Sequence, residues 1–168
     1  MTGLKAWHLR PASRFYPKRQ FEATLAGLPR GSQLILVAGE IDCREGLPGA
    51  VQKGRHDSLE AAIAAAVAVY VGVLSGLAAR GFEVFVHPPP PVLDVTRHIV
   101  APFCAALRSA VLAAAAARPG AGGRLHWLDF YEALLAPGGD ALADGLTLDG
   151  THLAPAYVAH LDDALQRL

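Results

Sequence analysis

Three short apolar runs occur along the chain, at residues 33–38, 82–87 and 125–130. Each has the length of a strand, and the first is continuously apolar, as expected for a strand that is buried on both faces. The second run is rich in residues that favour β-structure, such as Phe82, Val84 and Val86. Four consecutive prolines follow it, and they exclude both a helix and further strand pairing at residues 88–91.

Longer Ala-rich segments separate these runs and predict helices. The first follows a capping residue, Ser58 or Asp57, extends to about Arg80 and stops at Gly81. A second helix is predicted from residue 96 to 118, with Pro102 in or near its early turns, and the last from 155 to 168. Short helices are predicted at 21–28 and 131–135, and loops at 46–54, 119–123 and 137–145.

The alternation of strand and helix predicts an α/β fold. Such an order is typical of a parallel sheet with right-handed crossovers and helices on both faces, a three-layer α/β/α sandwich. No internal repeat or linker divides the chain. We therefore expect a single domain over residues 1–168, in which residues 1–32 form an irregular N-terminal segment.

Residues 61–79 carry no charge and are long enough to be weighed as a membrane span. Much of the segment is Ala, and Arg80 and Gly81 then enter a predicted strand directly. We therefore favour a buried crossover helix over a membrane span. On this interpretation, Gly72 and Gly76 let the helix lie close to the sheet.

Composition limits the classes of partner. The chain has 15 Lys and Arg against 15 Asp and Glu, so its charge does not favour nucleic acid. Its two cysteines, Cys43 and Cys104, form no disulfide framework, and no His, Cys or carboxylate spacing indicates a metal or another cofactor. The first ten residues lack the apolar core of a secretory signal, so we expect an intracellular location.

The most informative group of side chains lies near the C-terminus, where Asp149 precedes His152 by three residues. Pro155 predicts a helix start directly after them, because the first N–H groups of a helix have no partners within it. An imidazole on this loop can lean over the end of the sheet. A carboxylate beside it can fix its tautomer and stabilise its protonated form. The pair therefore predicts a general base that activates a hydroxyl.

A second polar segment, residues 39–44, follows the first predicted strand. In open α/β sheets, ligands bind beyond the carboxyl ends of the strands. His87 and Asp129 end the other two predicted strands, and the loop with Asp149 and His152 precedes a helix. We therefore expect these polar groups to meet at one edge of the sheet.

The two polar segments together resemble the SGNH (GDSL-type) hydrolase family. The Asp-x-x-His-Leu block at residues 149–153 is similar to the family's proton-transfer block, which implies that His152 is the base and Asp149 its partner. The segment Gly39-Glu40-Ile41-Asp42-Cys43-Arg44 is similar to a variant of the family's Gly-x-Asn-Asp block. The resemblance implies that substrate or oxyanion binding involves Gly39, Glu40, Asp42 and Arg44. It also implies an esterase or carbohydrate deacetylase that needs no cofactor.

Two departures from the family pattern change what we expect. Ile41 replaces the usual Asn, whose amide helps to hold an oxyanion. The Gly-Asp-Ser block that carries the nucleophile is absent, and only Ser13 and Ser32 precede residue 33. We therefore expect the sheet to lack the usual first strand. The serine would come from an unrecognised position, from another chain or from residues lost upstream.

Other interpretations stay open at this point. A relative without a nucleophile would be a binding protein, and an incomplete sheet could pair with another chain in an oligomer. Asp149 could form a structural turn, Glu40 and Arg44 a salt bridge, and Cys43 beside Arg44 a reactive thiol. His87 is expected at the rim of the site, and His126 is expected to be structural.

Overall fold

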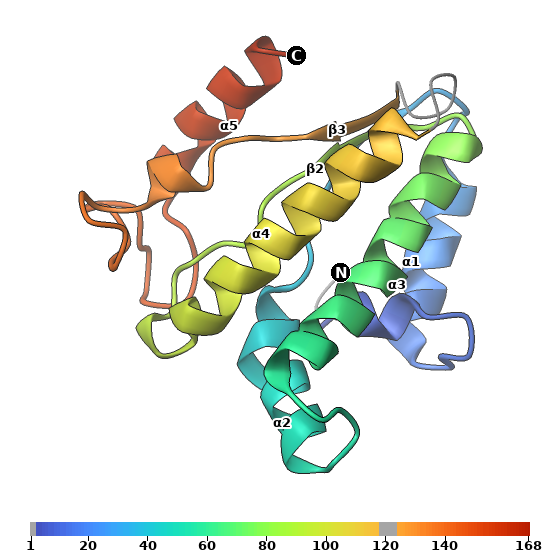
Figure 1. Cartoon of the computed structure of the whole chain (residues 1–168). Helices are drawn as coiled ribbons and strands as arrows, with labels where there is room; N and C mark the ends of the chain where they lie inside the picture. Colours follow the sequence, from blue (N-terminus) through green and yellow to red (C-terminus); the bar gives the residue numbers. More distant parts are fainter. Residues whose placement is uncertain (1–2, 118–123) are drawn as a thin grey trace.

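A three-stranded parallel sheet forms the centre of the computed structural model, which describes residues 3–117 and 124–168. Its strands are β1 (Gln33–Leu36), β2 (Glu83–Val86) and β3 (Leu125–Trp127), in the order β1-β2-β3. Each strand lies within one of the apolar runs and is shorter than predicted. Leu34 pairs with Val84, which in turn pairs with Leu125. Helices flank the sheet (Figure 1).

Two long helices, α3 (Leu59–Ala79) and α4 (Asp94–Ala116), pack together on one face of the sheet (Figure 1). Ser58 caps α3 as predicted, because its side chain accepts a hydrogen bond from the backbone N–H of Ala61. Alternate strand residues face these helices, among them Leu34, Val84 and Val86. This face therefore contains the main hydrophobic core.

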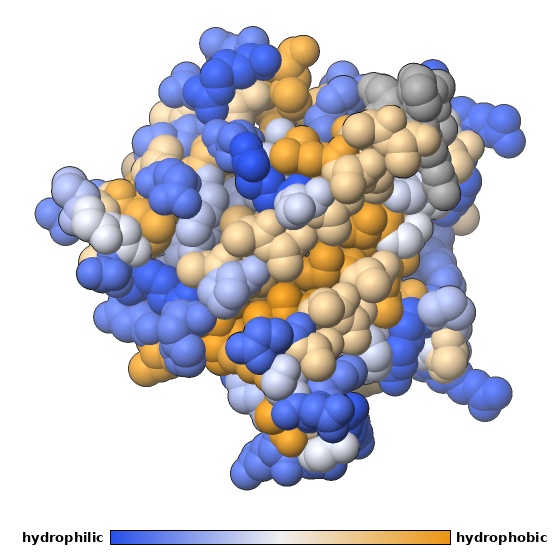
Figure 2. Space-filling view, in the orientation of Figure 1, coloured by the Kyte–Doolittle hydropathy of each residue, from blue (hydrophilic) through white to orange (hydrophobic). Residues whose placement is uncertain are grey.

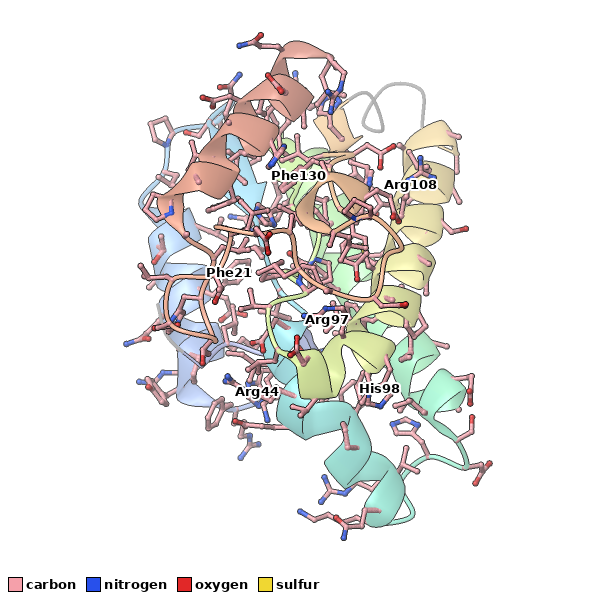
Figure 3. The ribbon with its side chains drawn as sticks, turned by 90° about the vertical axis from the view of Figure 1, so that its left-hand side faces the viewer. Phe21, Arg44, Arg97, His98, Arg108 and Phe130 are labelled. Carbon is pink, nitrogen blue, oxygen red and sulfur yellow. The ribbon has the colours of Figure 1, made fainter. Side chains whose placement is uncertain are left out.

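The opposite face is covered over part of its width by α5 (Val158–Gln166). Phe130 and Leu134 form a second cluster there with Ala164 of α5, and Phe85 packs against it. Figure 3 labels Phe130 near this helix. Ile35 of β1 lies on the same face of the sheet and is 46% exposed, so α5 leaves that strand uncovered.

The N-terminal segment is more regular than predicted. Helix α1 (Tyr16–Ala26) starts five residues before the predicted helix, because Pro17 is accommodated in its first turn. Phe21 and Leu25 bury one side of α1 in the main core. A 3-10 turn, Ala6–Leu9, precedes it, so the expectation of an irregular segment over residues 1–32 is wrong for these two stretches.

The predicted Gly/Pro loop at residues 46–54 is also wrong for most of its length. Helical residues begin at Glu40, continue through a π-helical turn (Asp42–Gly46) and end with α2 (Leu47–Gln52). Pro48 cannot donate a backbone hydrogen bond, and the turn before it widens: the N–H of Leu47 bonds to the carbonyl of Asp42, five residues back. The widened turn lets the helix continue past Pro48.

Helix α4 begins two residues earlier than predicted and includes Pro102. Its predicted end at Arg118 and the predicted turn 119–123 lie outside the described residues. The predicted helix at 131–135 is a single 3-10 turn, Glu132–Leu134. At the C-terminus, Pro155–Tyr157 forms a 3-10 turn that leads into α5, with Ala154 at the cap position.

Both long helices, α3 and α4, are long and apolar enough to cross a membrane, a test that core helices of soluble proteins also pass. Figure 2 shows apolar residues along α4 and between α4 and α3, framed by hydrophilic residues. The expectation that Gly72 and Gly76 approach the sheet is wrong. A Cβ atom built at either glycine meets nothing within 4 Å, and α3 instead buries larger side chains such as Tyr70 and Leu74.

Candidate functional site

A cleft of about 540 Å³ opens beyond the carboxyl ends of β1 and β2. Residues from three distant segments line it: Val37 to Ile41 after β1, His87 and Pro90 after β2, and Thr151 to Leu153 before α5. Gly39, Glu40 and His152, all predicted site residues, are therefore brought to one cleft. The other lining residues are Gly3, Leu4 and Tyr157.

Asp149 and His152 form a hydrogen-bonded pair at this cleft. Oδ2 of Asp149 lies 2.8 Å from Nδ1 of His152, while Oδ1 accepts backbone hydrogen bonds from Thr151 and His152, both at 2.9 Å. The hydrogen bond with the imidazole of His152 has the largest effect on the Asp149 carboxyl, followed by the two backbone hydrogen bonds. Together they lower the pKa of Asp149 to about 2. The carboxylate is ionised at neutral pH and can only accept a hydrogen bond, so Nδ1 carries the proton. Nε2 of His152 is then the nitrogen free to act as a base.

The pair is open to solvent, with 71% of the His152 side chain and 50% of the Asp149 side chain exposed. The two backbone bonds to Asp149 also make this loop an Asx-type turn. The structural and catalytic interpretations of Asp149 are thus compatible. The turn holds the carboxylate in the position from which it orients the imidazole.

Gly39 fixes the path of the chain after β1. Its φ is +115°, and a Cβ atom at this position would lie 2.4 Å from the buried ring of Phe103. Glycine is therefore required for both conformation and space. The carbonyl of Gly39 accepts the first helical hydrogen bond, from the N–H of Cys43 at 2.9 Å. The N–H groups of Glu40 and Ile41 precede this bond, so they have no acceptor within the helix.

Glu40 gives the cleft a carboxylate. Its side chain is 18% exposed, and burial raises its pKa, which the charges of Arg44 and His152 partly offset. Arg44 lies 3.9 Å from Glu40 and 3.7 Å from Glu45. The predicted Glu40–Arg44 salt bridge is present, though at a long distance, and Arg44 is not among the residues that line the cleft.

Asp42 has a different environment from the one predicted. It is fully buried, and its two carboxylate oxygens accept hydrogen bonds from the backbone N–H groups of Ala6 (2.7 Å) and Trp7 (3.0 Å). Burial raises its pKa, while these bonds lower it. Asp42 therefore anchors the N-terminal segment to the helical segment and does not line the cleft that holds His152.

The structure gives little support to the other candidate nucleophiles. Cys43 is fully buried, and burial raises the pKa of its thiol. Ser32 precedes β1, at the opposite end of the strand from the cleft, and bonds to the carbonyl of Pro29. Ser13 bonds locally to the N–H of Phe15. Among the described residues, Thr151 contributes the one aliphatic hydroxyl that lines the cleft.

His87 lies deeper in the cleft than predicted. It is 4% exposed, and its ring meets Phe130 and Tyr157 edge-on at centroid distances of 4.8 and 5.7 Å. Nδ1 lies 2.6 Å from the carbonyl of Pro88, which can only accept, so Nδ1 carries the proton. Burial lowers the pKa of His87. It therefore offers the cleft a neutral imidazole whose Nε2 accepts hydrogen bonds. The position of His87 at the end of β2 is the sequence feature that indicates its place in the cleft.

Asp129 and His126 lie away from the cleft. Asp129 pairs with Arg108 at 2.9 Å, and His126 stacks on Phe85 and bonds to Glu83. No group of three or more His, Cys, Asp or Glu residues within the described parts of the chain is arranged to hold a metal ion. Comparisons of the chain with protein-family models, curated proteins and solved structures find no match.

Proposed function

We propose that this cleft hydrolyses an ester, with His152 as the general base and Asp149 as the carboxylate that orients it. The observation that carries the proposal is the 2.8 Å contact between these side chains, at a cleft that also contains the start of a helix. The resemblance of both segments to SGNH hydrolases supports the same roles. The helices on both faces of the sheet are in keeping with the three-layer sandwich of that family.

The proposed reaction starts at Nε2 of His152. This nitrogen takes the proton of an attacking hydroxyl or water as the oxygen bonds to the ester carbonyl carbon. The imidazolium that forms is stabilised by Asp149. The N–H groups of Glu40 and Ile41 stabilise the developing oxyanion, which compensates in part for the side-chain amide that Ile41 lacks. His152 then returns its proton to the leaving alcohol as the carbon–oxygen bond breaks.

The lining of the cleft indicates a neutral ester. Leu4, Val37 and Ile41 give it apolar walls, and the negative charge of the Glu40 carboxylate repels anionic substrates. His87 can accept a hydrogen bond from a hydroxyl of the substrate. An O-acetyl group on a carbohydrate combines these features, since it places a small apolar acyl group beside free hydroxyls.

A specific observation favours a second candidate function. Within the described part of the chain, no serine lines the cleft, and His152 is largely exposed. A homologue with this geometry and no nucleophile would bind the same class of ligand without turning it over. The two candidates therefore share a ligand and differ in whether a product is released.

Hydrolysis of p-nitrophenyl acetate by the wild-type chain and by His152→Gln tests the proposal. Removal of a general base typically lowers the rate by about 10²–10⁴-fold, so we expect at least a hundredfold loss. His98→Gln is the matched control, because His98 is exposed on α4 (Figure 3) and does not line the cleft. Turnover that survives in His152→Gln would refute the assignment of the base.

Labelling with a fluorophosphonate then identifies the attacking group. Covalent labelling followed by mapping of the modified peptide identifies a side-chain nucleophile, with Thr151→Val as the first variant to examine. Turnover that depends on His152 without labelling indicates attack by water. Binding of an acetylated monosaccharide without turnover supports the second candidate function.

A further inference from the structure

A second cleft, separate from the one that contains His152, lies between the N-terminal segment and the helical segment 40–52. Its volume is about 510 Å³, and the two clefts have no lining residue in common. The charged residues that line it are Lys5, Arg10, Asp42, Glu45, Lys53 and Arg55. We call it the basic cleft.

Its positive charge exceeds its negative charge. Four permanent cations line it against two carboxylates. Asp42 already accepts hydrogen bonds from two backbone N–H groups, and Glu45 pairs with Lys5 at 3.2 Å. Lys53 and Arg55 are exposed at the edge of the cleft. The basic cleft is therefore electrostatically suited to an anion, although the whole chain is neutral.

Arg10 is held in place at this cleft. Its guanidinium donates a hydrogen bond to the carbonyl of Trp7 at 2.9 Å and lies 5.0 Å from the centroid of the Trp7 ring. The ring of His56 approaches Trp7 edge-on at 5.9 Å. A cation whose side chain is already ordered loses less entropy when it binds a ligand.

His8 adds a neutral hydrogen-bond donor. The backbone N–H of Lys5 donates to Nδ1 of His8 at 3.3 Å, so Nδ1 carries a lone pair and the proton lies on Nε2. Burial, followed by the charges of Lys5 and Arg10, lowers the pKa of His8. At neutral pH, His8 can therefore donate from Nε2 without adding a charge.

We propose that the basic cleft binds a phosphate-type oxyanion, either free phosphate or the phosphate of a small monoester. Such an anion accepts several hydrogen bonds at once, and here it meets guanidinium, ammonium and imidazole donors within one concave surface. The volume suits a small molecule, and the neutral charge of the chain does not favour a nucleic-acid polymer. This site is independent of the proposed ester hydrolysis.

Nuclear magnetic resonance of the His8 Cε1–H signal tests the proposal directly. Sodium phosphate and phenyl phosphate are titrated separately at constant ionic strength, with sodium chloride as the reference and the exposed His98 as the internal control. We expect a saturable change at His8 and a higher His8 pKa with bound anion, because a negative charge stabilises the imidazolium. A response that sodium chloride reproduces would overturn the proposal.

The two ligands distinguish the source of the anion. Tighter binding of phenyl phosphate identifies a monoester whose organic part contacts Trp7 or His56. Equal or tighter binding of inorganic phosphate identifies the free anion. Both results support the site, whereas the absence of saturation at His8 for both ligands rejects it.

Variants locate the binding to this cleft. Arg55→Gln should weaken the affinity for phosphate by about threefold to tenfold. Arg19 lies on the exposed side of α1, so Arg19→Gln should leave the affinity unchanged. Gly49 lines the cleft with open space around its Cβ position. Gly49→Glu should therefore abolish binding by adding a negative charge, while Gly49→Ala preserves it. Equal effects of Arg55→Gln and Arg19→Gln would overturn the assignment.

Discussion

Replacement of Gly39 by alanine should strongly destabilise the protein, because two separate costs meet at this residue. Its φ of +115° is a conformation that residues with a side chain rarely adopt, which costs about 1–2 kcal/mol. The added Cβ would also lie 2.4 Å from Cε1 of Phe103, a fully buried ring. Overpacking of a filled core costs a further 1–3 kcal/mol or so. We expect Gly39→Ala to lower the free energy of unfolding by about 2–5 kcal/mol.

Urea unfolding followed by tryptophan fluorescence measures this change, since Trp127 is buried in the core. Gly72→Ala is a matched control: Gly72 lies within α3, where a Cβ meets nothing within 4 Å. The control should raise stability by about 0.5–1 kcal/mol, because alanine favours the helix. The same substitution should thus have opposite signs at the two glycines.

A double-mutant cycle with Phe103→Leu separates the two costs at Gly39. The smaller side chain removes the clash but leaves the backbone strain, so the double variant should be more stable than additivity predicts, by about 1–3 kcal/mol. Energies that add within about 0.5 kcal/mol would show that the ring does not cause the loss. A loss below about 1 kcal/mol in Gly39→Ala alone would refute the whole explanation.

Three further predictions concern other parts of the fold. Arg97 is buried and donates to the carbonyls of Pro91 (3.0 Å) and Asp140 (2.7 Å), which joins α4 to two loops, so Arg97→Lys should cost about 2–3 kcal/mol in urea unfolding. Ala154 caps the last helical segment without a side-chain bond, and Ala154→Ser should raise the melting temperature by about 2–4 °C; an unchanged value would contradict this cap. Burial lowers the pKa of His87 below 6.5, so the unfolded chain binds more protons and stability should fall as the pH drops below 6.5. His87→Gln should reduce this loss between pH 7 and pH 5, and an unchanged pH dependence would contradict it.

The strands and long helices could be predicted because their signals are local. Apolar runs of strand length mark β1, β2 and β3, and Ser58 marks the start of α3 through its own side chain. The segment 46–54 was mispredicted because Gly and Pro usually break helices, whereas here a π-helical turn accommodates Pro48. The prediction that Gly72 and Gly76 face the sheet is wrong because α3 is apolar on all sides, so its sequence does not show which side faces the sheet.

At the candidate site, too, contacts between neighbouring residues could be predicted from the sequence, whereas contacts between distant residues could not. The contact between Asp149 and His152 spans three residues of one turn, so their spacing alone could predict it. Asp42 was mispredicted because its partners are backbone N–H groups of Ala6 and Trp7, more than 30 residues away. Any residue but proline supplies such an N–H group, so no sequence pattern identifies the partner. Contacts of this kind become visible only in the folded chain.

The helical segment 40–52 borders both clefts, and the charged residues that line the two clefts give them opposite preferences. At its start, Glu40 places a half-buried carboxylate in the cleft of His152, and its Oε1 has no hydrogen-bond partner among the described residues. Two residues after Glu40, the carboxylate of Asp42 accepts hydrogen bonds from two backbone N–H groups, and cations outnumber carboxylates in the basic cleft. A free phosphate ion should therefore bind in the basic cleft and not in the cleft of His152.

This electrostatic difference gives a joint prediction for the two proposed sites. Phosphate at a concentration that saturates the His8 signal should leave the Cε1–H signal of His152 unchanged and should not inhibit hydrolysis of p-nitrophenyl acetate. Glu40→Gln removes the repelling carboxylate, and in this variant phosphate should begin to perturb His152 and to inhibit. Competitive inhibition of the wild-type protein by phosphate would show that the carboxylate of Glu40 does not exclude anions from the cleft, and the electrostatic argument for a neutral ester would then be wrong.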